Sequence, residues 1–416
     1  MTLLLELNDF GVRCYSDGEL LHQSPGVAVT HKQLLLGDEA WQQSRLHPQN
    51  TYTEFWSQLN TAPINSHHPK VRHHGDLAYL HLQHIESQLP FELREQDVIY
   101  ALPSSTDRSA LALLLGISQQ CGLNTIGIVD QALASLLPHA QHSELWHLEM
   151  HLNDSVLTRL VLADDQLQRQ QFEVLNDQGW LKIHSKALQF ISDEFIQKTR
   201  FNPRHDADSE QLLFNAIPNW LTQCLSKPQI SCEIQGHNID IDSQQLRQFI
   251  CDCVPSVIEK LQSLDNLYLG DHLAQWQPLL AANSRATNLT QTQQTAAMST
   301  LSQQLQAHPE GVRFITNLPC AQKVDSLFKP SPHADHFLWK HCAYPLNGLY
   351  SLDSDGEIIT GEQTGALMYV QQGKVRAGEN AISLKQKSHE GSAFATGDQV
   401  HIEGLTEVMT FIEVKR

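Results

Sequence analysis

The chain has 416 residues, of which 41% are hydrophobic and 18% are charged, and its formal net charge is −18. This length exceeds that of one typical hydrophobic core and predicts two or three domains. The negative charge, with no run of Lys and Arg, argues against nucleic-acid binding, because phosphates are bound by basic surfaces.

The apolar segments are too short for a membrane span, so we expect no direct membrane insertion. The N-terminal stretch MTLLLELNDF lacks a basic region and carries two acidic residues, which predicts a first strand rather than a signal peptide. Cys251 and Cys253 are the only close pair of cysteines, and their spacing does not fit a zinc site. These features predict a cytoplasmic protein with reduced cysteines.

Residues 1–40 predict a meander of short strands with a hairpin turn at Asp17-Gly18, where positive φ is easily adopted. Helical patterns follow at Tyr52–Leu59 and Leu77–Leu89. Strand, helix, strand and short helix are then expected in turn at Asp97–Leu102, Arg108–Cys121, Thr125–Val129 and Gln131–Leu137. Such an alternation predicts a mixed or parallel sheet covered by helices.

The same pattern then restarts in the second half of the chain. Three consecutive strands are expected at Glu144–Leu152, Ser155–Ala163 and Gln166–Leu175. Helices follow, among them one predicted over Ser243–Leu264 and another over Thr292–Gln306. Because a meander followed by a crossover occurs twice, the sequence predicts a duplicated architecture.

The composition changes after about residue 310. Several prolines in Pro319–Pro345 predict an irregular connection. From Gly348 onward, short alternating runs separated by turns predict a small all-β domain. The predicted organisation is therefore residues 1–142 and 143–310 as two related halves, 311–345 as a linker and 346–416 as the β domain.

Several segments stand in the order typical of the DnaK-like heat shock protein 70 family, which belongs to the actin-like ATPase superfamily. The segments that carry this resemblance are LLGDEAWQQSRLHPQNTYTEFW at 35–56, DVIYALPSSTDRSALALLLGISQQCGLNTIGIVDQALASLL at 97–137, FEVL at 172–175, residues 230–264, and NLYLGDHLAQW at 266–276. The resemblance covers roughly residues 1–306. It implies an α/β, two-lobed actin-like fold built from a duplicated ribonuclease H-like unit, here followed by the small all-β domain.

In the family, glycines let two turns approach the phosphates of a nucleotide between the lobes. At the first turn, where the family has Asp-Leu-Gly-Thr-Thr, this chain has Glu6, Asn8, Asp9 and Phe10 around Leu7. The glycine is therefore Asn, and the two threonines are Asp and Phe. A carboxylate about 4 Å from a phosphate costs about 4 kcal/mol at an effective dielectric constant of about 20.

The second turn of the family reads Asp-Leu-Gly-Gly-Gly-Thr, and this chain has Glu149-Met150-His151-Leu152-Asn153-Asp154. All three glycines are missing, and the backbone cradle for phosphate is lost with them. The remaining matches are Trp56 in place of the phosphate-contacting lysine, Asp130 in place of a water-positioning glutamate, and Gly270-Asp271 in place of the Gly-Gly adenosine turn. The resemblance thus implies a vestigial nucleotide cleft, and we expect Phe10 and Trp56 to fill it.

Histidines gather in one short stretch and raise the alternative of a metal site. The members are His67, His68, His73, His74, His81 and His84. His81 and His84 are spaced to reach one metal from a helix. No nearby cysteine or acidic pair completes a ligand set, so a polar loop leading into a helix is the favoured interpretation.

These patterns predict a chaperone-like or scaffolding pseudo-ATPase that binds protein partners or clients and is not an enzyme. No cofactor is expected, and bound ATP with Mg²⁺ is the disfavoured alternative. Two other functions stay open. One is a genuine ATP-binding chaperone with an altered site, and the other, by analogy alone, is an actin-like assembly factor for an envelope machine.

Overall fold

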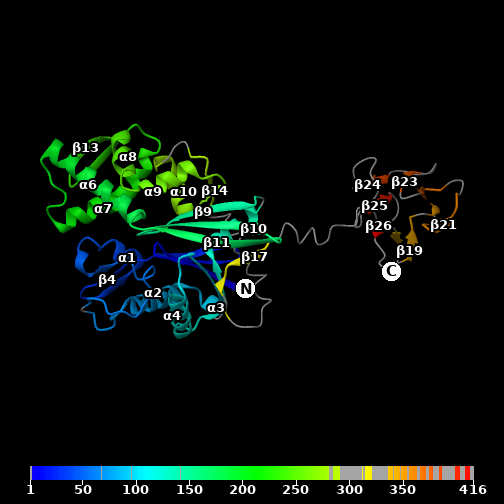
Figure 1. The fold of residues 1–416 in the computed structure, drawn as a ribbon, viewed down its shortest axis with the longest axis horizontal. Coiled ribbons are helices and arrows are strands. Elements are labelled where there is room, and N and C mark those ends of the chain that lie inside the picture. The colour runs from blue at the N-terminus through cyan, green and yellow to red at the C-terminus, as the bar shows by residue number, and fades with distance from the viewer. Residues whose placement is uncertain are drawn as a thin grey trace. The chain divides into compact units, whose positions relative to one another are not determined.

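The computed structural model describes residues 2–66, 68–94, 96–140, 142–280, 284–290, 312, 314–320, 336–340, 342–346, 348–353, 356–362, 366–371, 374–377, 384–386, 399–402 and 408–412. The described part is a mixed α/β structure with several sheets (Figure 1). It divides into two compact units, Met1–Cys320 and Ala321–Arg416. Among the helices of these ranges, none is both long enough and apolar enough to cross a membrane.

The first sheet of unit 1 has the strand order β16-β8-β7-β1-β2-β3. Its strands are β1 (Thr2–Asn8), β2 (Gly11–Ser16), β3 (Glu19–Pro25), β7 (Asp97–Leu102), β8 (Asn124–Asp130) and β16 (Phe314–Ile315). The central strand β1 is antiparallel to β2 and parallel to β7. Every residue of β1 after Thr2 is buried, because helices or strands cover both faces of this sheet at its centre.

The second sheet has the order β15-β14-β9-β10-β11-β17. Its strands are β9 (Glu144–Met150), β10 (Ser155–Ala163), β11 (Gln166–Leu175), β14 (Leu267–Leu269), β15 (Thr287–Asn288) and β17 (Asn317–Pro319). Here β9 is antiparallel to β10 and parallel to β14. An antiparallel meander followed by parallel strands beside its first member therefore occurs in both sheets, in the same order.

Helices cover the two sheets, and acidic residues cap several of them. The helices are α1 (Gly37–Trp41), η1 (Pro48–Asn50), α2 (His74–Gln88), α3 (Phe91–Arg94), α4 (Arg108–Gln120), α5 (Gln131–Leu136), η2 (Leu137–His139), α6 (Trp180–Thr199), α7 (Ala207–Cys224), α8 (Ser243–Cys251), α9 (Pro255–Ser263) and α10 (Asp271–Leu280). Two small sheets accompany them, formed by β4 (Ala28–Thr30), β5 (Leu34–Leu36) and β6 (Thr51–Tyr52), and by β12 (Gln229–Ile234) and β13 (His237–Asp242). Asp107 and Asp206 accept the N-terminal N–H groups of α4 and α7, respectively.

Two predicted helices differ from the structure. Ser243–Leu264 is not one helix but α8 and α9, because Pro255 starts a new helix where its missing N–H costs nothing. Tyr52–Leu59 is a strand end followed by a turn. Only Gln58 N–H reaches back to the Glu54 carbonyl, and the Asn60 side chain then accepts from Ala62 N–H and turns the chain away.

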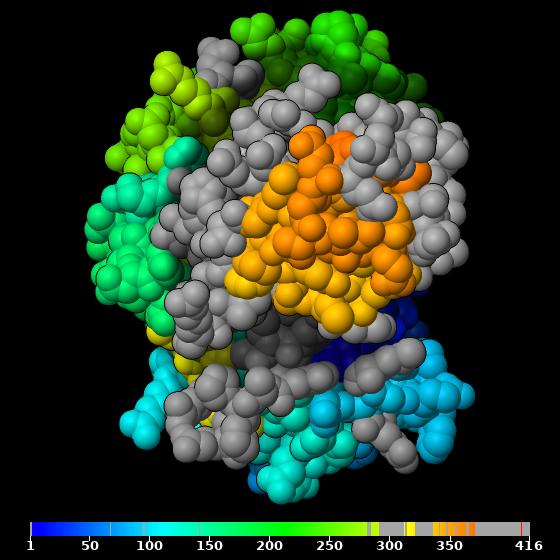
Figure 2. Space-filling model, turned by 90° about the vertical axis from the view of Figure 1, so that its right-hand side faces the viewer, coloured from blue at the N-terminus to red at the C-terminus, as the bar shows by residue number. Residues whose placement is uncertain are grey.

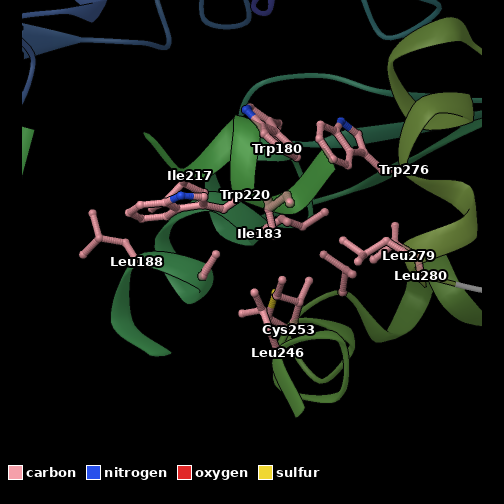
Figure 3. Packing of buried hydrophobic residues seen from close by; sticks show 14 of the residues in the cluster. Trp180, Ile183, Leu188, Ile217, Trp220, Leu246, Cys253, Trp276, Leu279 and Leu280 are labelled. Carbon is pink, nitrogen blue, oxygen red and sulfur yellow. The ribbon is translucent and has the colours of Figure 1, made fainter. Parts of the chain in front are cut away.

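The two sheets share a hydrophobic core around α5. From the first sheet come Leu4, Ile99 and Val129; from α5 comes Leu133; from the second sheet come Leu145 and Leu160. A larger cluster lies behind the second sheet, where Trp180 of α6 stacks on Trp276 of α10 with ring centroids 4.6 Å apart (Figure 3). This packing holds the two sheets together, and the turns after β1 and β9 meet at the candidate site.

Unit 2 is all-β in its described part, with a five-stranded sheet β19-β18-β26-β25-β24 and a four-stranded sheet β21-β20-β22-β23. The strands are β18 (His336–Trp339), β19 (Cys342–Pro345), β20 (Leu349–Leu352), β21 (Ile358–Thr360), β22 (Met368–Gln371), β23 (Lys374–Ala377), β24 (Leu384–Gln386), β25 (Gln399–Ile402) and β26 (Val408–Ile412). Phe337, Trp339, Met368 and Met409 form its core. Figure 2 shows the strands of this unit that it colours, yellow to orange, as one continuous group of atoms.

The predicted bounds of the linker need correcting. The range 311–345 contains β16 and β17, which complete the two large sheets, and β18 and β19, which belong to unit 2. The prolines that predicted an irregular connection therefore hid four short strands. The helix predicted over Thr292–Gln306 lies outside the described residues.

A truncation tests the role of the last two strands of unit 1. We expect residues 1–320 to unfold cooperatively, and residues 1–311 to be less stable by about 3 kcal/mol, because Leu318 and Cys320 are buried between the sheets. Urea unfolding of the two fragments measures the difference. Equal stability would show that β16 and β17 are accessory to the fold.

Candidate functional site

The candidate site lies where the turn after β1 meets the turn after β9. Asp9, on the first turn, is 2% exposed. Its carboxylate accepts from Leu152 N–H at 2.8 Å, from Asn153 N–H at 3.2 Å and from the Asn153 side-chain amide at 2.9 Å. One carboxylate from the first half therefore satisfies two backbone N–H groups of the second.

The first turn closes on itself through Asn8. Its side-chain oxygen accepts from Phe10 N–H at 2.9 Å and from Gly11 N–H at 3.3 Å. This is the local turn that an Asn side chain favours. The N–H groups of this turn are therefore bonded to the chain itself.

A buried ion cluster joins β2 to the start of α10. Arg13 lies 2.9 Å from the carboxylate of Asp271 and 3.7 Å from that of Glu6. Burial alone would lower the pKa of Arg13, but the two carboxylates outweigh it and raise the pKa. Burial raises the pKa of Glu6, and the Arg13 charge opposes that shift. The pairing makes burial of the guanidinium tolerable.

Next to this cluster, Phe10 stacks on the ring of His272 with centroids 3.8 Å apart and an interplanar angle of 18°. The guanidinium of Arg13 lies 3.4 Å from Nδ1 of His272. Burial, with a smaller contribution from Arg13, lowers the pKa of His272 to about 3. The ring is therefore neutral at pH 7, and the contact is a stack of uncharged rings.

Glu149 is the least compensated group of the site. It is 2% exposed, and neither of its carboxyl oxygens has a hydrogen-bond partner in the described ranges. Burial raises its pKa well above the usual value, and the charges of Asp271 and Glu6 add to the shift. A Cβ at Gly270 would lie 1.4 Å from Oε2 of Glu149, so only glycine fits beside it.

Asp130 ties the end of β8 to the second sheet. It caps α5 by accepting from Ala132 and Leu133 N–H, and it also accepts from the Ser104 hydroxyl at 3.0 Å. Arg169 of β11 lies 2.8 Å from the other oxygen of Asp130. The carboxylate therefore has a complete set of partners from the protein.

The structure brings most of the predicted residues together. Those at the meeting of the two turns, or directly beside it, are Glu6, Asn8, Asp9, Phe10, Glu149, Asn153, Gly270 and Asp271. Asp154 instead accepts from Asp177 N–H within the second half. Trp56 packs in the core of the first sheet and donates its indole N–H to His81 at 3.0 Å, so Phe10 and Trp56 have different partners.

Sequence reasoning missed Arg13 and His272. The signal for Arg13 was a single cation inside the otherwise apolar strand GVRCY, since a buried charge needs a partner. For His272 no comparable signal exists, because its role depends on Phe10, which is far away in the chain.

A second connection between the halves was also missed. Gln211 of α7 accepts from Arg45 N–H at 2.7 Å and donates to the Trp41 carbonyl at 3.2 Å. The Arg45 guanidinium lies 4.5 Å from the ring of Phe214, and His184 packs against the same ring. The two halves are thus joined far from Asp9 as well.

The histidine stretch shows individual roles in its described part. His73 caps α2 by accepting from Asp76 N–H, and buried His81 bonds both Trp56 and Ser24. Within the ranges that the structure describes, no three His, Cys, Asp or Glu side chains are grouped to hold a metal. His67 lies outside those ranges.

No family model matches the chain, and no curated protein matches it. The geometry of the two turns decides whether a nucleotide fits. Phosphate oxygens need free N–H donors and a site without uncompensated carboxylates. Both turns have their donors bonded to side chains, and Asp9 and Glu149 add acidic groups, so the residues do not fit a triphosphate.

Replacing Asp9 tests the central contact. We expect Asp9→Ala to lower the free energy of unfolding by about 2 kcal/mol, because buried N–H groups of Leu152 and Asn153 lose their acceptor. Urea unfolding measures the loss. Asp193→Ala, which removes an exposed carboxylate from α6, is the matched control and should change stability little. An unaffected Asp9→Ala protein would contradict the assignment.

The buried His184 gives a pH-dependent test. Burial, aided by Arg45, lowers its pKa from 6.5 to about 3, so below pH 6.5 the unfolded chain binds a proton that the folded chain does not. Stability is therefore lost as the pH falls. His184→Phe removes this loss. The substitution should therefore raise the free energy of unfolding by about 1.4 kcal/mol more at about pH 5.5 than at about pH 8. Urea unfolding of both proteins at the two pH values measures it, and an equal effect at both would contradict it.

Proposed function

We propose that this chain is a pseudo-ATPase of the actin-like superfamily, related to the DnaK-like chaperones, that binds other proteins without a nucleotide cycle. The observation that carries the proposal is the Asp9 carboxylate on the N–H groups of Leu152 and Asn153. In the family that the sequence resembles, these are the positions of the second phosphate turn. A protein carboxylate thus takes the role of the anion.

The matching strand order of the two sheets supports the two-lobed part of this proposal. Each sheet has a three-strand meander whose first strand lies parallel to later strands. These are β7, β8 and β16 in the first sheet, and β14 and β15 in the second. The first turn follows β1, and the second follows β9, the equivalent strand of the other sheet. Two equivalent turns facing each other are what the actin-like fold uses to hold phosphates.

Contacts between the halves support a single closed state. Arg13 pairs with Asp271, Phe10 stacks on His272, and Gln211 bonds the Trp41–Arg45 segment. A ligand drives a conformational cycle only when it binds one state better than another. Here the protein's own side chains supply the closing contacts, so closure needs no ligand.

Two features support protein partners over other classes of ligand. The net charge of −18 disfavours nucleic acid. Unit 2, which is all-β in its described part, is a second compact unit with a surface of its own. The eight cysteines form no disulfide in the described part of the chain, which supports a cytoplasmic location. The proposed role is a rigid scaffold or chaperone-like binder of partner or client proteins.

Thermal unfolding in the presence of millimolar Mg-ATP tests the proposal. We expect no rise in melting temperature, because a ligand stabilises only the state that binds it. A nucleotide present at about 100 times its Kd would add about 2.7 kcal/mol and move the transition visibly.

The control for this experiment is Mg-AMP at the same concentration, which shares the base, the ribose and the metal ion but lacks the β- and γ-phosphates. A rise with Mg-ATP but not with Mg-AMP would favour the alternative of a genuine ATP-binding chaperone with an altered site. Capture of partners from native cells, identified by mass spectrometry, then names the bound proteins.

A further inference from the structure

A cavity of about 170 Å³ lies beside the candidate site, at the carboxyl ends of β1 and β7. β2 and β3 follow β1 on one side of the sheet, and β7 and β8 lie on its other side, so the strand order reverses between β1 and β7. Crevices outside the carboxyl ends of strands at such a switch point are where open α/β sheets bind ligands. The contacts described so far leave this cavity without a role.

The floor of the cavity consists of apolar side chains that are buried in the protein core. Its side chains are Leu7, Trp56, Leu59, Leu102 and Leu114, each at most 8% exposed. They come from the ends of β1 and β7, from the middle of α4 and from the turn that follows β6. A cavity of about 150 Å³ lined by such residues holds one benzene-sized ring. The volume and the floor therefore suit a single aromatic ring.

The rim of the cavity offers hydrogen-bond acceptors and no cation. Asp107 is exposed there, and the backbone N–H of Ala110 at the start of α4 lowers the pKa of its carboxyl group. His151 also lines the cavity, and its buried Nε2 has no hydrogen-bond partner in the described ranges. Burial lowers the pKa of His151 to about 4, so the ring is neutral. None of the lining residues is Lys or Arg.

We propose that this cavity binds a phenol: a ring that lies on the leucines and Trp56, with a hydroxyl that donates to the acceptors at the rim. An anionic ligand is disfavoured, because Asp9 and Asp107 both line the cavity and no cation offsets them. A purely apolar ring would leave the buried Nε2 of His151 without a partner. The phenol is therefore the chemistry that satisfies both parts of the cavity.

Such a phenol comes either from a free small molecule or from a tyrosine side chain of a partner protein. The partner's tyrosine follows from the proposed protein-binding function and rests on it, since aromatic side chains in preformed pockets dominate many interfaces. The phenol site itself stands on the geometry of the cavity alone.

A ligand-observed NMR titration of the full chain with p-cresol tests the site. We expect saturable binding, at least about tenfold tighter than binding of toluene or benzoate, because only p-cresol combines the ring with a neutral donor. Ala110→Leu, which fills the cavity from α4, should weaken p-cresol binding at least about tenfold. Ala112→Leu adds the same group to an exposed position of the same helix and should leave binding unchanged.

A short tyrosine peptide and its phenylalanine counterpart distinguish the two sources. Displacement of p-cresol by the tyrosine peptide alone supports a partner's side chain, and p-cresol binding that neither peptide displaces supports a free phenol. No binding of p-cresol, equal binding of toluene or benzoate, or full binding by Ala110→Leu overturns the inference. The Mg-ATP experiment is read separately, because it reports a nucleotide and not a phenol, although Asp9 and His151 of the two turns also line the cavity.

Discussion

The hydrogen bonds from Leu152 and Asn153 to Asp9 are the contact on which the rest of this site depends. They join the first turn of one sheet to the equivalent turn of the other. The donors are backbone groups, so they are present whatever side chains the second turn carries. The side-chain amide of Asn153 adds a third donor, and a carboxylate is the strongest acceptor that a side chain can supply.

Few charges compensate one another around this contact, and this explains why the buried groups Glu149 and His272 are shifted toward their neutral forms. Arg13 is the only cation in the cluster, and it faces Glu6 and Asp271. A third ionised carboxylate would have no counterion, and the raised pKa of Glu149 keeps that group toward its neutral form. Burying an ion pair contributes little stability, but removing one partner is costly. The cluster therefore specifies how the halves meet more than it strengthens the fold.

The order of strands was open to prediction because it follows from apolar runs and turn residues. The hairpin at Asp17-Gly18 is present as expected, with φ of 49° and 84°. The turn at Tyr52–Leu59 was predicted wrongly as a helix, because Phe55, Trp56 and Leu59 are buried by tertiary packing and not by a helical face. Pro255 marked the break between α8 and α9, but the apolar pattern on both sides hid it.

Much less of the site could be predicted, because its contacts join distant parts of the chain. Asn153 and Asp9, or Asp271 and Arg13, are each obvious polar residues, but no local pattern says that they meet. Most of the residues that the resemblance singled out lie beside one another in the structure, but the resemblance did not predict their bonds. It marked Asp9 as a poor neighbour for phosphate, and the structure adds that this carboxylate bonds the opposite turn.

The two turns also differ in a way that explains the cavity beside them. Asn8 bonds back to its own turn, so the side chain that follows it, Asp9, is free to reach across to the second sheet. That carboxylate accepts from two N–H groups of the turn after β9. The cavity at the ends of β1 and β7 is lined by Leu7 and Leu102, and by Asn8 and Asp9 of the first turn. The Asp9 carboxylate therefore closes the meeting of the two turns, and the preformed cavity lies beside that contact.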